Sequence, residues 1–180
     1  MKRGYKRDGI DLTIETERLL IYPISDEAMR ELISSETDPE LKKAYSEMLQ
    51  GCINEPESRI WHAVWFLELK SQPGTVVGDL SFKGICTGGA VEIGYGLRDG
   101  FCKAGYMREA VRAAVSWALS QEGVLRVEAE TEPGNSASQK LLAACGFVPT
   151  GTEGEEGPRF VFKHTSIDIS AKREGGEIPE

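Results

Sequence analysis

The stretch that decides the fold is Glu130–Phe147, with the sequence ETEPGNSASQKLLAACGF. Its first residues end a strand, and Asn135 belongs to the residue types that most often cap the start of a helix. The residues that follow predict a helix over 135–145, because Gly146 is a typical helix stop. Phe147 then begins another strand. The stretch therefore predicts a strand, a turn, a helix and a second strand in direct succession.

The chain on either side completes an α/β pattern. A longer helix is predicted over 106–120, where apolar residues recur in steps of three and one and form a stripe that faces a core. Gly94 and Gly96 predict a bulge or a close approach to the backbone of their strand. Strands are predicted over 16–21, 61–69, 75–82, 90–97, 124–131, 147–150 and 157–163, and early helices over 25–33 and 38–49.

Composition and charge exclude several classes of protein. The 180 residues fit one domain with one core. The net charge of −8 argues against nucleic-acid binding, which needs a clustered basic face. No apolar run approaches the ~20 residues of a membrane span, and none follows the basic start, so neither a membrane partner nor a secretory signal is expected. The four cysteines (Cys52, Cys86, Cys102 and Cys145) form no CxxC pair, which indicates no metal site and favours the cytoplasm.

A second informative segment is Phe101–Ala110, FCKAGYMREA, between a strand and the long helix. A loop in this position presents free backbone N–H groups at the positive end of a helix, and these groups suit a pyrophosphate. Gly105 lets a ligand approach the backbone, and Lys103 and Arg108 add positive charge. A plain helix start with a turn glycine explains the same residues. The loop alone leaves both interpretations open.

Taken together, these segments resemble the GNAT superfamily, the acyl-CoA-dependent N-acetyltransferases. The stretch that starts at Asn135 resembles a conserved motif of that family. Gly105–Ala110 resembles the Gly-Tyr-x-x-Glu-Ala loop of its ribosomal-protein N-acetyltransferase (Rim-type) branch. Thr16–Ile21 resembles the opening strand of that branch, Thr-x-Arg-Leu, while Val77–Leu80 and Val91–Tyr95 resemble its third and fourth strands. The matches occur in the family's order along most of the chain.

The resemblance implies a mixed α/β fold. Its sheet would be twisted and mostly antiparallel, with about seven strands, about four flanking helices, and a splay between the fourth and fifth strands. One domain would span 1–168, followed by a flexible tail over 169–180. The implied activity is transfer of an acetyl group from acetyl-CoA to a primary amine by direct attack in a ternary complex. Neither a metal nor a covalent enzyme intermediate is implied.

The resemblance also assigns the acetyl-CoA contacts, most of them made by backbone amides. Cys102 and Met107 stand where the strict family pattern has Gln or Arg and Gly or Ala. The residues expected to bind acetyl-CoA are Tyr95, Gly96, Leu97, Cys102, Lys103, Ala104, Gly105, Tyr106, Met107, Arg108, Asn135 and Ser138.

Catalytic roles follow from the same resemblance. Leu142 occupies the position where the family often has the tyrosine that protonates the departing thiolate. Ser138, one helical turn after Asn135, becomes the expected acid, with Asn135 as its companion, although Ser138 also suits a capped first turn. Backbone N–H groups of Tyr95–Leu97 are expected to stabilise the oxyanion.

A carboxylate could take the proton of the amine. Glu92 is the first choice, because it lies on the strand before the cofactor loop. Glu128 and Glu130 on the next strand are alternatives, and each of the three is equally well explained as an ordinary solvent-facing strand residue.

Two rival functions and several acceptors stay open at this point. The chain could be a non-catalytic acyl-CoA-binding or regulatory domain of the same fold, since Leu142 replaces the usual acid. It could also be an α/β interaction module without CoA. The acceptor could be a protein N-terminus, an amino acid, a polyamine or an aminoglycoside-like drug, and a homodimer is an open alternative to a monomer.

Overall fold

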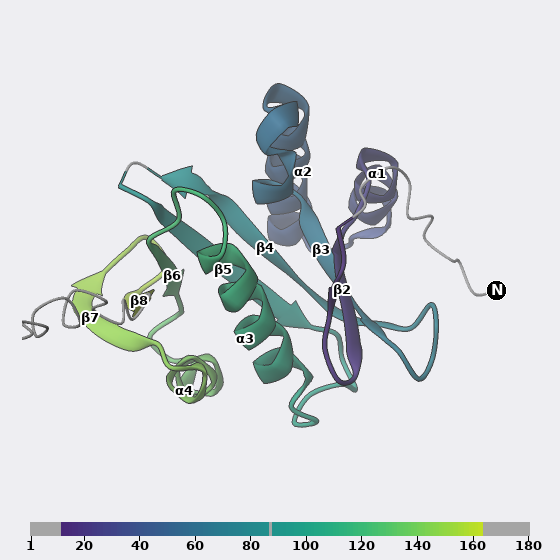
Figure 1. The fold of residues 1–180 in the computed structure, drawn as a ribbon. Coiled ribbons are helices and arrows are strands. Elements are labelled where there is room, and N and C mark those ends of the chain that lie inside the picture. Colours follow the sequence, from purple (N-terminus) through teal and green to yellow (C-terminus); the bar gives the residue numbers. More distant parts are fainter. Residues whose placement is uncertain (1–11, 87, 164–180) are drawn as a thin grey trace, which may run out of the picture.

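The computed structural model describes residues 12–86 and 88–163 (Figure 1). The tail predicted over 169–180 lies outside the described residues. The strands are β1 (Ile14–Glu15), β2 (Leu19–Pro23), β3 (Val64–Leu69), β4 (Val76–Cys86), β5 (Ala90–Leu97), β6 (Arg126–Glu130), β7 (Val148–Glu153) and β8 (Pro158–Lys163). The helices are α1 (Asp26–Ser35), α2 (Pro39–Asn54), the 3₁₀ helix η1 (Pro56–Trp61), α3 (Tyr106–Leu119) and α4 (Ser136–Cys145).

The strands form one mixed sheet, in the order β1-β2-β3-β4-β5-β6-β8-β7. Neighbouring strands are antiparallel except β5 and β6, which are parallel. Their pairing runs from Ala90–Arg126 to Glu92–Glu128, yet β5 continues to Leu97 and β6 to Glu130. The mixed α/β class and the predicted splay between these two strands are therefore confirmed. The sheet has one strand more than predicted, because the short β1 adds an edge.

Of the two features predicted as alternatives at Gly94 and Gly96, a bulge or a close approach to the backbone, the bulge is wrong. The register of β4 with β5 is regular from Gly78–Leu97 to Phe82–Ile93. The irregularity lies further along β4, between Phe82 and Ile85, where Gly84 has a φ of 70°. A left-handed glycine suits a bulge, so the extra residue is accommodated on β4 and not on β5.

The helices cover the sheet from two sides. In Figure 1, α1 and α2 stand on one side of the sheet, and α3 lies across the other. The stripe predicted for the long helix is confirmed, because Met107, Ala110, Val111, Ala114, Val115 and Ala118 are buried. They belong to one apolar cluster with Leu142 and Cys145 of α4, whereas α1 and α2 pack into a second cluster around Phe66.

Local signals fix most helix starts. Ser25 caps α1, Asp38 caps α2, and Asn135 caps α4 by accepting a hydrogen bond from the Ser138 N–H at 3.0 Å. The strand predicted from residue 61 begins only at 64, because Trp61 ends η1 and packs against Phe82 and Trp117. Tertiary packing of this aromatic side chain outweighed its preference for strands.

Candidate functional site

The loop before α3 provides a helix start whose N–H groups are free of a side-chain cap. Gly105 stands at the N-cap with a φ of 81°, and no side chain of the described residues caps this end of α3. Lys103 is left-handed as well, with a φ of 65°. The first-turn N–H groups are therefore available to an anion at the positive end of the helix. This geometry supports the predicted pyrophosphate loop.

Glu109 ties this helix start to the beginning of the chain. Its Oε1 accepts hydrogen bonds from Thr16 Oγ1 at 2.5 Å and from the Arg18 N–H at 2.8 Å. Its Oε2 accepts from Arg18 Nε at 2.7 Å, and Arg18 Nη1 donates to the carbonyl of Ala104 at 2.8 Å. The Glu of Gly-Tyr-x-x-Glu-Ala thus binds the Thr and the Arg of Thr-x-Arg-Leu. The two sequence motifs form one structural unit that holds the loop.

Positive charge gathers at the same place. A cavity of about 390 Å³ is lined by Gly105, by the three arginines Arg18, Arg108 and Arg112, and by the carboxylates Glu17 and Glu109, among others. The Arg18 guanidinium also lies 4.6 Å from the centre of the Tyr106 ring. Because Arg18 is paired with Glu109, the positive charge beside the free helix N–H groups comes mainly from Arg108 and Arg112, and such groups suit phosphates.

Side chains of the loop point in different directions. Met107 is 3% exposed and lies in the core, so its bulk does not crowd the outer side of the loop. Cys102 and Lys103 are exposed. Any contact of Met107 with a ligand would come from its backbone, which fits the expectation that this loop binds mainly through amides.

Backbone N–H groups of β5 face the gap where β5 and β6 separate. The Arg98 N–H donates to the Val77 carbonyl on β4 at 2.9 Å. Because N–H groups alternate between the two edges of a strand, those of Tyr95 and Leu97 face the β6 side. Pairing with β6 has ended at Glu92. Both N–H groups therefore point into the gap, as the predicted role of oxyanion donors requires.

A pair of hydroxyl groups lies on the α3 and α4 side of this gap. Tyr95 Oη and Ser138 Oγ are 2.9 Å apart, and either can donate to the other. Burial raises the pKa of the Tyr95 hydroxyl, against the opposing effect of its hydrogen bond with Ser138. The phenol therefore stays protonated near neutral pH and could donate a proton. Leu142, at the family's usual tyrosine position, is 0% exposed and belongs to the core.

Sequence reasoning missed the Tyr95 hydroxyl and used only its backbone. The pairing joins residues 43 positions apart on β5 and α4. No local pattern signals it, since it depends on how α4 packs against β5. Asn135 does cap α4 through its side-chain oxygen, so part of its function in this structure is to hold Ser138 in place.

A pocket of about 710 Å³ opens on the opposite face, between α1, α2 and the strands β4 and β5. Gly94 and Gly96 form its floor. A Cβ built at Gly96 would meet nothing within 4 Å, and one at Gly94 only Ser81 Oγ at 3.5 Å. Since side chains alternate along β5, this floor and the Tyr95 side chain lie on opposite faces of the sheet. An acceptor entering here would reach the gap from the face opposite the hydroxyl pair.

Asp79 on β4 lines this pocket beside Gly96. Its Oδ2 accepts a hydrogen bond from Tyr45 Oη of α2 at 3.3 Å. Burial raises the pKa of Asp79 to about 6, while Tyr45 and Arg98 lower it and Glu36 raises it further. Burial and Asp79 also raise the pKa of Tyr45. From the sequence, Asp79 is predicted only as part of a strand.

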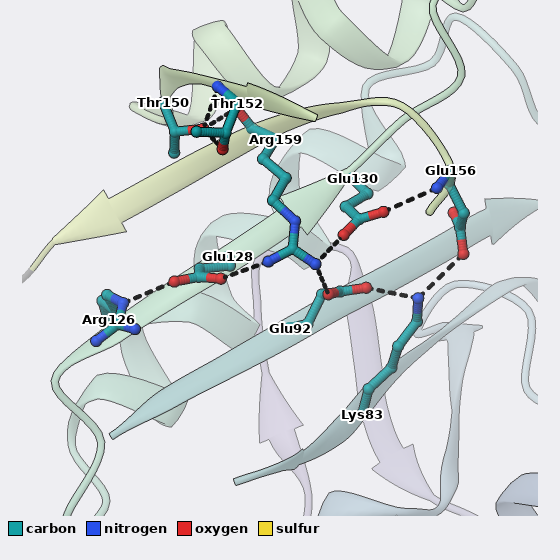
Figure 2. A network of polar contacts seen from close by, with 9 residues as sticks. All are labelled: Lys83, Glu92, Arg126, Glu128, Glu130, Thr150, Thr152, Glu156 and Arg159. Carbon is teal, nitrogen blue, oxygen red and sulfur yellow. Dashed lines mark hydrogen bonds and ion pairs between the residues drawn. The ribbon is translucent and has the colours of Figure 1, made fainter. Parts of the chain in front are cut away.

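The three carboxylates predicted as alternative bases lie together in one network (Figure 2). Glu92 pairs with Lys83 Nζ at 2.5 Å and lies 3.8 Å from Arg159 Nη2. Arg159 also contacts Glu128 at 3.6 Å and Glu130. Glu92 and Glu128 are partly buried, with side chains 15% and 21% exposed. Both carboxylates are therefore paired with cations, Glu92 with Lys83 and Glu128 with Arg126 and Arg159.

Glu130 is the most deeply buried of the three, with a side chain 4% exposed. Burial opposes its ionisation, but the Glu156 N–H at 3.0 Å, Arg159 and Lys83 together hold the pKa of Glu130 below its usual value. A lowered pKa makes Glu130 a weak base, and its contacts connect β6, β8 and the loop between β7 and β8.

The described residues, 12–86 and 88–163, contain no group of three or more His, Cys, Asp or Glu side chains that could hold a metal ion. In the same part of the chain, no helix combines the length and the apolar character needed to cross a membrane.

Known proteins similar to this chain carry the same domain. A model of the acetyltransferase (GNAT) domain matches residues 15–148. YjdG of Bacillus subtilis (strain 168), described as an uncharacterized N-acetyltransferase, is 35% identical over 47% of this chain and 50% of its own length. The similarly described p20 of Bacillus licheniformis is 29% identical over 77% of this chain and 84% of its own length.

Solved structures agree on the fold. RimL, a ribosomal L7/L12 α-N-protein acetyltransferase solved with coenzyme A, is 16% identical and superposes with a TM-score of 0.67. The match covers 84% of this chain and 98% of that one. The family model spans most of the described residues, from β1 to the start of β7. On this evidence the protein belongs to the GNAT family of acetyltransferases.

Proposed function

We propose that this protein transfers the acetyl group of acetyl-CoA to a primary amine by direct attack in a ternary complex. The observation that carries the proposal is the gap between β5 and β6. Its α3 end has free helix N–H groups, its edge carries the N–H groups of Tyr95 and Leu97, and its two faces carry a hydroxyl pair and a pocket.

The described residues fit acetyl-CoA, which supplies an activated acetyl thioester when bound. The first turn of α3 would bind its phosphate groups, with charge from Lys103, Arg108 and Arg112. The facing edges of β5 and β6 beyond Glu92 and Glu128 carry backbone groups that could pair with ligand amides.

Groups on both faces of the sheet would contact the reacting atoms in the gap between β5 and β6. Tyr95 and Leu97 N–H groups would stabilise negative charge on the carbonyl oxygen. The Ser138 hydroxyl, hydrogen-bonded to Tyr95, would give a proton to the leaving sulfur. Because the pocket lies on the other face, the amine would attack from the side opposite the departing group. Asn135 would act by holding Ser138.

The acceptor we propose is a primary amine, either a protein N-terminus or a small molecule. RimL is named for a ribosomal protein, and SpeG of Vibrio cholerae, another protein of this fold, for spermidine. Free thiols at Cys52, Cys102 and Cys145 suit a reducing cytoplasm. A homodimer stays an open alternative. The second candidate function is binding of acyl-CoA without catalysis, which the core position of Leu142 favours.

Thermal unfolding with acetyl-CoA tests the first half of the proposal. Ligand at about a hundred times its dissociation constant should stabilise the protein by about 2.7 kcal/mol. Gly105→Ala and Gly100→Ala form a matched pair, since both glycines have positive φ values, 81° and 88°, and so carry similar backbone strain. Only Gly105→Ala should strongly weaken the stabilisation. No stabilisation of the wild type would reject acyl-CoA binding.

Release of the CoA thiol with amine acceptors tests the second half. Transfer to spermidine or to a short peptide with a free α-amino group supports catalysis. Stabilisation by acetyl-CoA without transfer to any amine would instead support the non-catalytic alternative.

A further inference from the structure

Three carboxylates that line the acceptor pocket, Glu36, Asp79 and Asp99, form no ion pair with another described residue, and of these Asp79 is the one paired with Gly96 on the pocket floor. We propose that Asp79 accepts the proton of the amine before the amine attacks, while Glu92 stabilises the wall of the pocket. This inference rests on the proposed acetyl transfer. It assigns the base to a residue on β4 and not to the strand before the cofactor loop.

The position of Asp79 follows from the register of β4 and β5. Asp79 is paired with Gly96, between Tyr95 and Leu97, whose N–H groups face the gap. Side chains of directly paired residues start about 5 Å apart. Since Gly96 has no side chain, the space beside the Asp79 carboxylate stays open to an acceptor. An amine above Gly96 would thus lie between the proton acceptor and the oxyanion donors.

The surroundings of Asp79 differ from those of Glu92. Glu92 is bound by Lys83 at 2.5 Å and approached by Arg159. Within the described residues, Asp79 forms no salt bridge of that kind, and its hydrogen-bond partner is the hydroxyl of Tyr45. A proton acceptor that has to release its proton again benefits from such weaker pairing.

Charged and titratable groups reach Asp79 from every side of the pocket. Tyr45 comes from α2, Glu36 follows α1, and Arg98 follows β5. Lys83 and Asp99 line the same pocket. Burial, with Glu36 in support, keeps the pKa of Asp79 raised to about 6 against Tyr45 and Arg98. A carboxylate with this pKa is ionised at neutral pH and still basic enough to take a proton from an ammonium group.

The step balances without a further reactant. One proton of the ammonium group moves to the carboxylate of Asp79, and the nitrogen keeps the lone pair. That pair forms the C–N bond as the C–S bond breaks, and the sulfur takes a proton from the hydroxyl pair of Ser138 and Tyr95. The second nitrogen proton leaves to solvent through the pocket as the amide forms, and the hydroxyl pair regains its proton from solvent on its own face of the sheet. Asp79 then releases its proton to solvent through the pocket.

The test compares Asp79→Asn with Glu92→Gln, using spermidine and a short peptide with a free α-amino group as acceptors. Wild-type kcat/KM should fall on the acid side with an apparent pKa near that of Asp79. Asp79→Asn should lower kcat/KM by about 10²-fold or more and should remove this fall of kcat/KM toward low pH, the acid limb of the profile. Its affinity for acetyl-CoA should stay within about twofold of the wild type, which also shows that the variant folds. Glu92→Gln should keep the limb.

Tyr45→Phe tests the role of Asp79 through the pH at which kcat/KM falls, which would not change if Asp79 had only a structural role. The Tyr45 hydroxyl stabilises the charged carboxylate, so its loss should raise the pKa of Asp79 and shift the acid limb to higher pH. An unchanged limb in Tyr45→Phe, or an intact limb in Asp79→Asn, overturns the role of Asp79 alone. Loss of the limb in Glu92→Gln returns the base to Glu92. If wild-type protein acetylates neither probe, the proposed function fails, and the role of Asp79 fails with it.

Discussion

Arg18 and Glu109 lie 91 positions apart in the chain, yet the backbone N–H and the Nε of Arg18 both donate to the Glu109 carboxylate, at 2.8 Å and 2.7 Å. One residue precedes β2 and the other belongs to the first turn of α3. Their contact explains why Thr-x-Arg-Leu and Gly-Tyr-x-x-Glu-Ala occur in one sequence. The first strands support the loop to which we assign the phosphate groups.

Replacing Glu109 by Gln should therefore destabilise the fold. The change removes the charge that Thr16 and Arg18 contact and should lower the free energy of unfolding by about 1–3 kcal/mol near pH 7. Burial opposes ionisation, but Thr16 and Arg18 hold the pKa of Glu109 below its usual value. A lowered folded-state pKa means that the contribution is complete above the unfolded value, 4.5, and is lost as pH falls through the folded value.

Urea unfolding of wild type and Glu109→Gln across this pH range measures the difference. Glu47→Gln, on the exposed face of α2, is the control and should change stability little. A difference for Glu109→Gln that persists undiminished in acid would contradict the explanation.

The hydroxyl pair predicts a coupled effect on turnover. Ser138→Ala and Tyr95→Phe should each lower kcat by about 10²-fold, because either change interrupts proton delivery to the leaving sulfur. The double variant should lose little more than one single variant, since both groups act as a unit. Steady-state kinetics with acetyl-CoA binding as a second readout measures this, and Ser136→Ala on the exposed start of α4 is the control. Unchanged turnover in Ser138→Ala would remove Ser138 from the mechanism.

Two glycines of neighbouring strands should respond differently to the same change. A Cβ at Gly96 enters empty space above the pocket floor, so Gly96→Ala should fold normally and raise the KM of the acceptor. A Cβ at Gly78 would collide with the Gly96 carbonyl oxygen, so Gly78→Ala should lower stability by about 1–3 kcal/mol. Thermal unfolding and acceptor kinetics distinguish the two. Equal loss of stability in both variants would show that the floor is not open.

Arg159→Met should expose the repulsion within the network of Figure 2. It leaves Glu92, Glu128 and Glu130 without their shared cation, although Lys83 and Arg126 remain nearby, and should cost about 1–3 kcal/mol of unfolding free energy near pH 7. The pKa of Glu130 is lowered in the fold, so the stabilisation exists above its unfolded value and fades as pH falls below it. Lys163→Met, at the exposed end of the same strand, serves as the comparison. A loss that is independent of pH would point to packing alone.

Local signals were enough for much of the fold. Asn135 and Gly146 bracket α4, and the strand predicted at 90–97 is β5 residue for residue. The predicted bounds of elements were wrong where packing against residues distant in the sequence sets the end of an element. The helix α2 was predicted to end at residue 49, but it continues to Asn54. Buried Cys52 packs near Met29 of α1, so the face of α2 that packs against α1 extends beyond the predicted end.

The site divides in the same way. The loop at Gly105 could be predicted because consecutive residues form it. The contact of Tyr95 with Ser138 could not, since the two residues lie 43 positions apart, one on β5 and the other on α4. Asp79 gave no signal, because its environment comes from Tyr45 on a separate helix and from burial, neither of which a strand pattern encodes.

Three residue pairs join the backbones of β5 and β6, so the backbone connection between the two parts of the sheet, one ending in β5 and the other starting with β6, is short. A ligand bound in the gap would contact both β5 and β6 and would restrain the motion of the two parts of the sheet relative to each other. Amide hydrogen exchange should then slow on both sides of this connection when acetyl-CoA binds, even in a variant that cannot turn it over. Because the connection between β5 and β6 is short, amide hydrogen exchange across the whole sheet should report whether the site is occupied.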